Sequence, residues 1–150
     1  MTATNHALTG ALIGLSLGQP WLAIPAALLS HFVCDATPHF GFRQTAIGSK
    51  LFRNVLLTDV ALCVLLVVVL VILQPSNWFL AAVCAFVATS PDLMWLKKFR
   101  QARQGRKIGQ DRSIIRRFHA DIQWFEKPIG LAVEAVWAVS AIILLKVYII

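Results

Sequence analysis

The chain has 150 residues, of which 58% are hydrophobic and only 14% are charged, and its mean hydropathy is +0.71. A soluble domain of this length cannot bury so much apolar surface, so the composition excludes an ordinary soluble protein and predicts an integral membrane protein. Because each membrane-spanning helix needs roughly 20 residues, residues 1–150 form one membrane domain of four or five spans, with no room for a soluble catalytic domain.

Five apolar segments follow one another along the chain, at 6–18, 21–36, 52–73, 78–96 and 129–149. The first two are separated by Gly18, Gln19 and Pro20, a turn signal that predicts a tight helical hairpin. The sequence QPSN at 74–77 is a second turn signal, between the third and fourth segments. The predicted fold is therefore all-α, a polytopic helical bundle of about five transmembrane helices that begins with a helical hairpin.

Basic residues lie mostly in two loops, at 40–53 and 97–117, and account for most of the formal net charge of +7. The turns GQP and QPSN have no Lys or Arg. The positive-inside rule therefore places both basic loops and the N-terminus in the cytoplasm, and the C-terminus outside. Since topology explains this charge, we expect no nucleic-acid partner.

The segment RSIIRRFHADIQWFE at 112–126 alternates apolar and basic residues with helical spacing. Its apolar stripe comprises Ile114, Ile115, Phe118, Ile122 and Phe125, and its cationic face comprises Arg112, Arg116 and Arg117. This pattern predicts a cytoplasmic interfacial helix lying on anionic lipid headgroups of the bilayer. His119 stands at the boundary of that stripe, next to the layer of polar residues described next.

Ionisable side chains concentrate toward the cytoplasmic ends of the predicted spans. These residues are His6, His31, Asp35, His39, Asp59, Asp92, His119, Asp121 and Glu126. Glu134, eight residues and therefore about 12 Å along a helix from Glu126, has a depth comparable to that of Asp59. We therefore expect distant segments to bring carboxylates and imidazoles into one layer. The sequence assigns no role to Asp121 or Glu126, and Glu134 is as consistent with structural pairing to another span as with a function.

His31 and Asp35 are one helical turn apart, so both side chains lie on one face and can hold one ion. Pro38 ends this helix before His39, which either folds back toward the pair or points away. Gly10, Gly14 and Gly18 recur every four residues and predict a groove for close helix packing. His6 continues this glycine ridge and should face other helices.

These residues predict a divalent-metal site with His6, His31, Asp35, His39 and His119 as candidate ligands. Mixed imidazole and carboxylate ligands favour Zn²⁺, with Mn²⁺ and Fe²⁺ as alternatives. A carboxylate outside the ligand set, Asp59 or Asp92, would serve as general base. The competing structural interpretations are a hydrogen-bonded interfacial histidine for His6, an interhelical hydrogen-bond network for Asp59 and an interfacial position beside Pro91 for Asp92.

The segments NHALTGALIG and SHFVCDATPHFG resemble the start of small bacterial inner-membrane proteins of the membrane-bound metal-dependent hydrolase family. The resemblance covers chiefly residues 5–42, with PDLMW at 91–95 and FHADIQWFE at 118–126 as weaker matches. His6, His31 and Asp35 match the family pattern best. The resemblance implies a multi-pass protein of the bacterial inner membrane that performs metal-dependent hydrolysis.

The predicted activity is hydrolysis of an anionic, amphipathic, lipid-like ester or phosphoester at the cytoplasmic interface, beside the basic loops. One alternative is a proton- or ion-coupled transporter that uses Asp59 and Glu134 as a relay. The other is a noncatalytic scaffold whose basic loop recruits an acidic protein or lipid. A transporter needs polar groups across the whole bilayer, whereas the outer halves of these spans have almost none.

Overall fold

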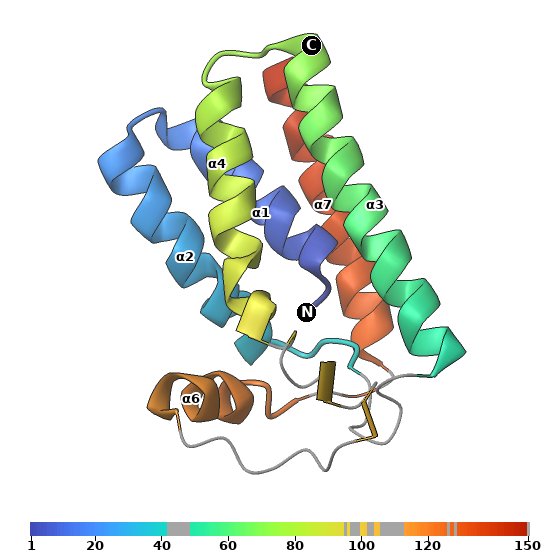
Figure 1. Cartoon of the computed structure of the whole chain (residues 1–150). Helices are drawn as coiled ribbons and strands as arrows, with labels where there is room; N and C mark the ends of the chain where they lie inside the picture. The colour runs from blue at the N-terminus through green and yellow to red at the C-terminus, as the bar shows by residue number, and fades with distance from the viewer. Residues whose placement is uncertain are drawn as a thin grey trace.

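The structure is a computed structural model of the whole chain, shown in Figure 1. It describes residues 1–41, 49–94, 96, 100–101, 104–105, 113–125, 127 and 129–149. Glu126 and most of the predicted basic loop at 97–117 lie outside the described residues, as does the side chain of Arg116.

The elements that the structure describes are all helices, as predicted. They are α1 (Ala3–Leu17), α2 (Pro20–Ala36), α3 (Lys50–Leu73), α4 (Trp78–Thr89), the 3₁₀ helix η2 (Ser90–Met94), α6 (Ile114–Ile122) and α7 (Gly130–Ile149). The expected N-terminal hairpin is formed by α1 and α2, because Gly18 ends α1 with a left-handed φ of 64° and Pro20 begins α2. The second predicted turn contains Gln74 and Asn77, both with positive φ.

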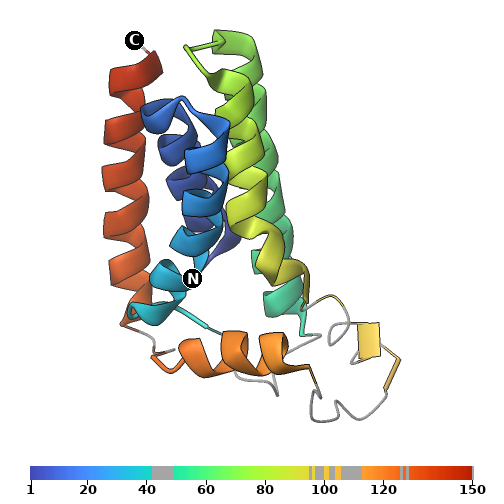
Figure 2. The ribbon, with the colours of Figure 1, turned by 90° about the vertical axis from the view of Figure 1, so that its left-hand side faces the viewer.

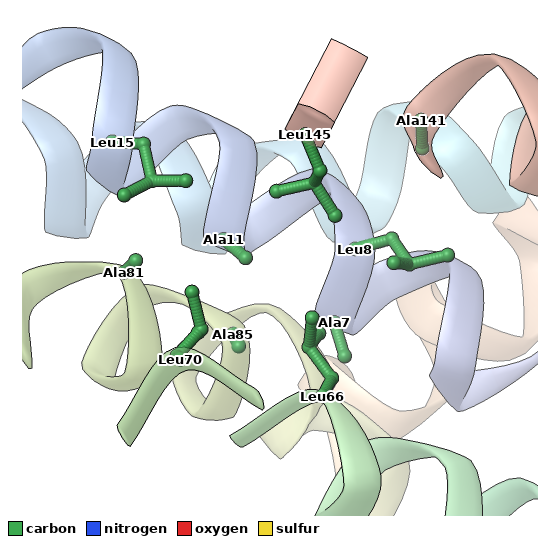
Figure 3. Packing of buried hydrophobic residues seen from close by; sticks show 10 residues of the cluster. All are labelled: Ala7, Leu8, Ala11, Leu15, Leu66, Leu70, Ala81, Ala85, Ala141 and Leu145. Atoms are coloured by element: carbon green, nitrogen blue, oxygen red, sulfur yellow. The ribbon is translucent and has the colours of Figure 1, made fainter. Parts of the chain in front are cut away.

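Helix α1 lies in the middle of the bundle and contacts α2, α3, α4 and α7. The main core is made almost entirely of alanine and leucine (Figure 3): Ala7, Leu8, Ala11, Leu15, Leu66, Leu70, Ala81, Ala85, Ala141 and Leu145. The predicted glycine groove is present, and α4 occupies it. A Cβ added to Gly10 would lie 2.3 Å from the carbonyl oxygen of Cys84, and one added to Gly14 would lie 2.5 Å from Cα of Ala81.

Two described helices, α3 and α7, are long and apolar enough to cross a membrane. Helix α2 and the segment Trp78–Met94 are apolar but shorter. Large apolar side chains cover the outside of the bundle; Trp21, Ile72 and Val147 are each at least 70% exposed. The outer surface is therefore apolar on helices from both ends of the chain.

One end of the bundle collects the chain segments that contain the ionisable residues (Figures 1 and 2). The N-terminus, the end of α2, η2 and the starts of α3 and α7 lie there, and α6 crosses this end. The turn between α3 and α4 lies at the opposite end, near the C-terminus. Hydrogen bonds join the start of α1 to Asp59 and Glu134, so the prediction of one polar layer is confirmed.

Candidate metal centre

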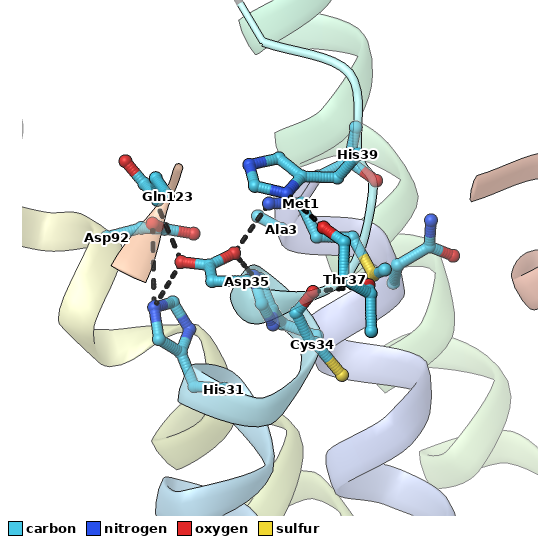
Figure 4. Close-up of polar contacts among 12 residues, drawn as sticks. Met1, Ala3, His31, Cys34, Asp35, Thr37, His39, Asp92 and Gln123 are labelled. Carbon is cyan, nitrogen blue, oxygen red and sulfur yellow. Dashed lines mark hydrogen bonds and ion pairs between the residues drawn. The ribbon is translucent and has the colours of Figure 1, made fainter. Parts of the chain in front are cut away.

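Helix α2 presents His31 and Asp35 toward the inside of the bundle, and both side chains are fully buried. Because one helical turn separates them, Nε2 of His31 lies 3.2 Å from Oδ2 of Asp35 (Figure 4). Pro38 cannot continue the helix, and α2 ends at Ala36, directly after this pair. The pair therefore stands at the polar end of the bundle, where other segments reach it.

Helix α6 adds His119, which is 88 residues from His31 in sequence. Its Nε2 lies 2.9 Å from Nε2 of His31 and 3.1 Å from Oδ2 of Asp35. The ring of Phe32 packs edge-on against both imidazoles, with centroids 5.3 and 6.0 Å away. His119 is only 2% exposed, although it belongs to a helix with a mostly exposed surface.

The proton position on the His31 ring follows from its backbone partner. Nδ1 of His31 lies 2.8 Å from the carbonyl oxygen of Ala88, which can only accept a hydrogen bond, so Nδ1 carries a proton. Nε2 of a neutral His31 then presents a lone pair toward Nε2 of His119 and Oδ2 of Asp35. Nε2 of His119 either donates one proton to this pair or, when unprotonated, makes a third acceptor, and three such acceptors need a cation between them.

The spacing of the three atoms fits a metal ion. Two ligand atoms about 2.1 Å from one ion are about 3.0 Å apart at the roughly 90° angle of octahedral coordination and about 3.4 Å apart at the tetrahedral angle that Zn²⁺ prefers. The three distances among His31 Nε2, His119 Nε2 and Asp35 Oδ2 are 2.9, 3.1 and 3.2 Å. Two histidines and one carboxylate arranged around one face of an ion leave its other positions open.

Asp92 supplies a second carboxylate from η2. Pro91 lacks a backbone N–H, and α4 gives way to the 3₁₀ turn that holds Asp92. Oδ1 of Asp92 lies 3.9 Å from Nε2 of His31 (Figure 4). It lies at the same distance from Nε2 of His119. One donor atom from each of these four residues lies within 4.8 Å of the others, so the group could hold a metal ion. Asp92 is the most accessible member, with a side chain 26% exposed.

His6 contacts the other oxygen of Asp35. Its Nε2 is 3.1 Å from Oδ1 of Asp35, and its ring stacks on His31 with centroids 4.0 Å apart. The amino group of Met1 also lies 2.5 Å from Oδ1 of Asp35. In the described part of the chain, Nδ1 of His6 has no hydrogen-bond partner. His6 therefore holds Oδ1 of the Asp35 carboxylate, whereas His31 and His119 face Oδ2.

Gln123 is a member of the site that the sequence prediction missed. Its Nε2 donates to Oδ2 of Asp35 at 3.0 Å (Figure 4). Gln123 directly follows α6, one turn after His119, and the shared helical face was the only signal in the sequence. An amide near an interfacial helix is too common to be identified without the contact itself.

His39 is buried but lies outside the group of four donor residues. Its Nδ1 is 2.8 Å from the carbonyl oxygen of Thr37, and its backbone pairs with Phe125 and Lys127. The start of α7 touches this backbone so closely that a Cβ on Gly130 would lie 2.0 Å from the carbonyl carbon of His39. The sequence left open whether His39 folds back toward His31 and Asp35 or points away from them. In the structure His39 lies beside the start of α7, outside the donor group.

Asp59 and Glu134 also lie outside the donor group, and both bind the start of α1. Asp59 accepts hydrogen bonds from the backbone N–H groups of Ala3 and Thr4, each at 2.8 Å, and from the Thr4 hydroxyl. Glu134 accepts from the backbone N–H of Thr2 and the side chain of Asn5 through Oε2, at 3.2 and 3.3 Å. These bonds between α3 and the start of α1 match the interhelical hydrogen-bond network that was the structural interpretation of Asp59, and they do not support its role as a general base. Asp121 is exposed.

No family model, curated protein or solved structure matches this chain. The resemblance to membrane-bound metal-dependent hydrolases therefore stays a prediction.

Proposed function

We propose that this protein is a membrane-embedded metal-dependent hydrolase that cleaves an anionic, lipid-like ester or phosphoester at the cytoplasmic interface. The observation that carries the proposal is the convergence of His31 Nε2, His119 Nε2 and Asp35 Oδ2, at 2.9–3.2 Å from one another. Buried imidazoles and carboxylates are costly in an apolar bundle and are retained chiefly where they have partners or a function.

The proposed topology has five spans in the bacterial inner membrane, with the N-terminus in the cytoplasm. The membrane-length stretches of α3 and α7 are mostly unburied, unlike the core helix of a soluble protein. Exposed apolar residues on α2 and α4, such as Leu29, Val33 and Phe86, extend this surface around the bundle. The donor residues then lie at the cytoplasmic side, where the basic loops follow the positive-inside rule.

His31, His119 and Asp35 would hold the ion, which we propose to be Zn²⁺, with Mn²⁺ and Fe²⁺ as alternatives. When bound, such an ion polarises the scissile group and lowers the pKa of a coordinated water toward 7. His6 and Gln123 orient Asp35 by hydrogen bonds to its two oxygens, at 3.1 and 3.0 Å. The Ala88 carbonyl fixes the His31 ring so that Nε2 points toward His119 and Asp35, where it would hold the ion.

Asp92 is the proposed proton acceptor. Its Oδ1 is further from the two histidines, at 3.9 Å, than they are from Asp35, and its side chain is partly exposed. A carboxylate in this position can take a proton from an attacking water molecule without leaving the site. Asp59, the other base candidate, has both carboxylate oxygens bound to the start of α1.

The proposed substrate follows from the surroundings of the site. Exposed apolar side chains on α2 and α6, including Val33 and Phe118, suit acyl chains. Exposed Arg117 and Lys127 suit an anionic headgroup. A lipid-like molecule at the cytoplasmic leaflet would present its ester or phosphoester at the depth where the donor residues lie.

The test is hydrolysis by the full-length protein in phospholipid nanodiscs supplied with Zn²⁺ or Mn²⁺. Phospholipids and short-chain fluorogenic esters and phosphodiesters serve as substrates, and product release is followed by mass spectrometry or fluorescence. We expect metal-dependent release that His31→Ala abolishes and His39→Ala retains. Equal hydrolysis by wild type and His31→Ala would contradict the proposal.

A transporter is less well supported. Its proposed relay residues, Asp59 and Glu134, are both engaged by hydrogen-bond donors at the start of α1. Among the described residues with a charged side chain, Lys146, near the end of α7, lies nearest the opposite end of the bundle. A continuous polar pathway across the bilayer has no support in the described part of the chain.

A further inference from the structure

Helix α6 has one buried histidine on one side and exposed, large apolar side chains on the neighbouring side. One side carries His119, which is 2% exposed and lies 2.9 Å from His31. The neighbouring apolar side is open, since Ile114 is 82% exposed, Ile115 65% and Phe118 53%. A short helix that exposes three large apolar side chains to water is unstable by itself, so something must cover this face.

The position of α6 indicates that a lipid surface covers it. The helix crosses the end of the bundle where α3 and α7, the two membrane-length helices, begin (Figures 1 and 2). The Phe118 ring lies 5.8 Å from that of Phe32 on α2, which joins the apolar face of α6 to the apolar outer surface of α2. Exposed Arg117 on the same helix matches an anionic headgroup.

We infer that α6 is a lipid-seated helix whose contact with anionic lipid holds His119 in the metal centre, so that metal affinity depends on the membrane surface. This inference rests on the proposed function and adds its regulation. His31 and Asp35 are fixed by one helix, whereas His119 reaches them only from α6. Seating Ile114, Ile115 and Phe118 in the interface orders α6 and aims His119 at His31 and Asp35. Release of this face withdraws one of the three ligands.

Lipid contact and metal binding both require an ordered α6, so each of them offsets part of the free-energy cost of ordering this helix. Amphipathic helices bind the interface through buried apolar area and attraction to anionic lipid. The packing of α6 on the bundle is limited in the described residues, and it includes the contacts of Phe118 and His119 with Phe32. Lipid contact therefore stabilises the arrangement in which His119 lies beside His31 and Asp35, which is the arrangement that binds the ion. By thermodynamic reciprocity, the bound ion strengthens the contact of α6 with lipid.

The test compares the full-length protein with the double variant Ile114→Ser, Ile115→Ser in nanodiscs of phosphatidylcholine alone and with phosphatidylglycerol added. Zn²⁺ dissociation constants are measured by competition with a chelating dye. Anionic lipid concentrates Zn²⁺ near the surface for both proteins, so the ratio of their constants in one type of disc is the relevant quantity. The matched control is Ile72→Ser, because Ile72 is also 71% exposed but belongs to the far end of α3.

We expect the double variant to bind Zn²⁺ about 10- to 100-fold more weakly than wild type in phosphatidylglycerol discs. Ile72→Ser should bind like wild type. Addition of phosphatidylglycerol to the discs should slow hydrogen exchange of peptide 114–122 in wild type and not in the double variant. The protection should not change when each disc holds one or two copies of the chain.

Three results would overturn the inference. The first is equal Zn²⁺ affinity of wild type and the double variant. The second is protection of α6 only when two copies share a disc, which would identify a second copy as the covering partner. The third is the absence of bound metal in wild type in every disc, which would also sink the proposed function. Lipid-dependent metal binding without any hydrolysis would contradict the proposed function alone.

Discussion

The close packing of α1 against α4 gives a prediction about stability and the metal centre together. In Gly10→Ala the new Cβ would lie 2.3 Å from the carbonyl oxygen of Cys84 and 2.8 Å from Cβ of Ala88. Ordinary contact begins at 3.4 Å, so α4 must retreat by about 1.1 Å, since backbone atoms cannot rotate away. Over-packing of this kind costs about 1–3 kcal/mol of unfolding free energy. By contrast, glycine to alanine in an unhindered helix interior gains about 0.8–1 kcal/mol.

The same shift should reach the metal centre, because the carbonyl of Ala88 accepts the hydrogen bond from Nδ1 of His31 at 2.8 Å. We expect Gly10→Ala to bind Zn²⁺ about 10-fold more weakly, as for loss of an outer-shell partner. Unfolding in mixed micelles and dye competition measure the two effects. Gly105→Ala is the control, since nothing lies within 4 Å of its added Cβ; its φ of +66° costs some stability but leaves metal affinity unchanged. A Gly10→Ala protein that is stabilised and binds Zn²⁺ normally would refute the packing of α1 on α4.

Other contacts yield three further predictions. Asp92→Asn should retain bound metal but lose hydrolysis at least 100-fold, as expected for a general base; loss of the ion, measured by elemental analysis, would instead make Asp92 a ligand. Asp59→Asn should lower the unfolding free energy by about 1–2 kcal/mol through weaker capping of α1 and keep the metal content, and metal loss in the folded variant would contradict this separation. Gln123→Leu should weaken Zn²⁺ binding about 10- to 100-fold, because it removes a hydrogen bond to Asp35, and unchanged affinity would show that this contact has no effect on the site.

The helices were the most predictable part of the molecule. Long apolar runs and turn residues such as Gly18 and Pro20 act locally, so the sequence pattern alone located α1 and α2 within a few residues of their ends. The polar layer was predictable as well, because turns reverse the chain and return the helix ends to one side. The number of membrane spans stays a prediction, since among the described helices only α3 and α7 have the length and composition of a span.

The partners of individual side chains were less predictable, because they depend on how distant segments pack. The glycine ridge predicted close packing but not that α4, rather than α2, occupies the groove. His39 could not be placed from sequence, since its position depends on the strand-like pairing with Phe125 and Lys127. Asp59 seemed a base candidate because its own helix offers no partner, and its partners come from the start of α1.

The metal content of the purified full-length protein tests the central claim most directly. Elemental analysis after removal of loosely bound ions should find a stoichiometric transition metal, Zn²⁺ first, in wild type and in His39→Ala, a buried histidine outside the donor group. His31→Ala and Asp35→Ala should insert and fold but lose the ion, because each removes one of the three atoms that lie 2.9–3.2 Å apart. A folded wild-type protein without stoichiometric metal, or undiminished metal in both variants, would contradict the metal centre and favour a noncatalytic scaffold.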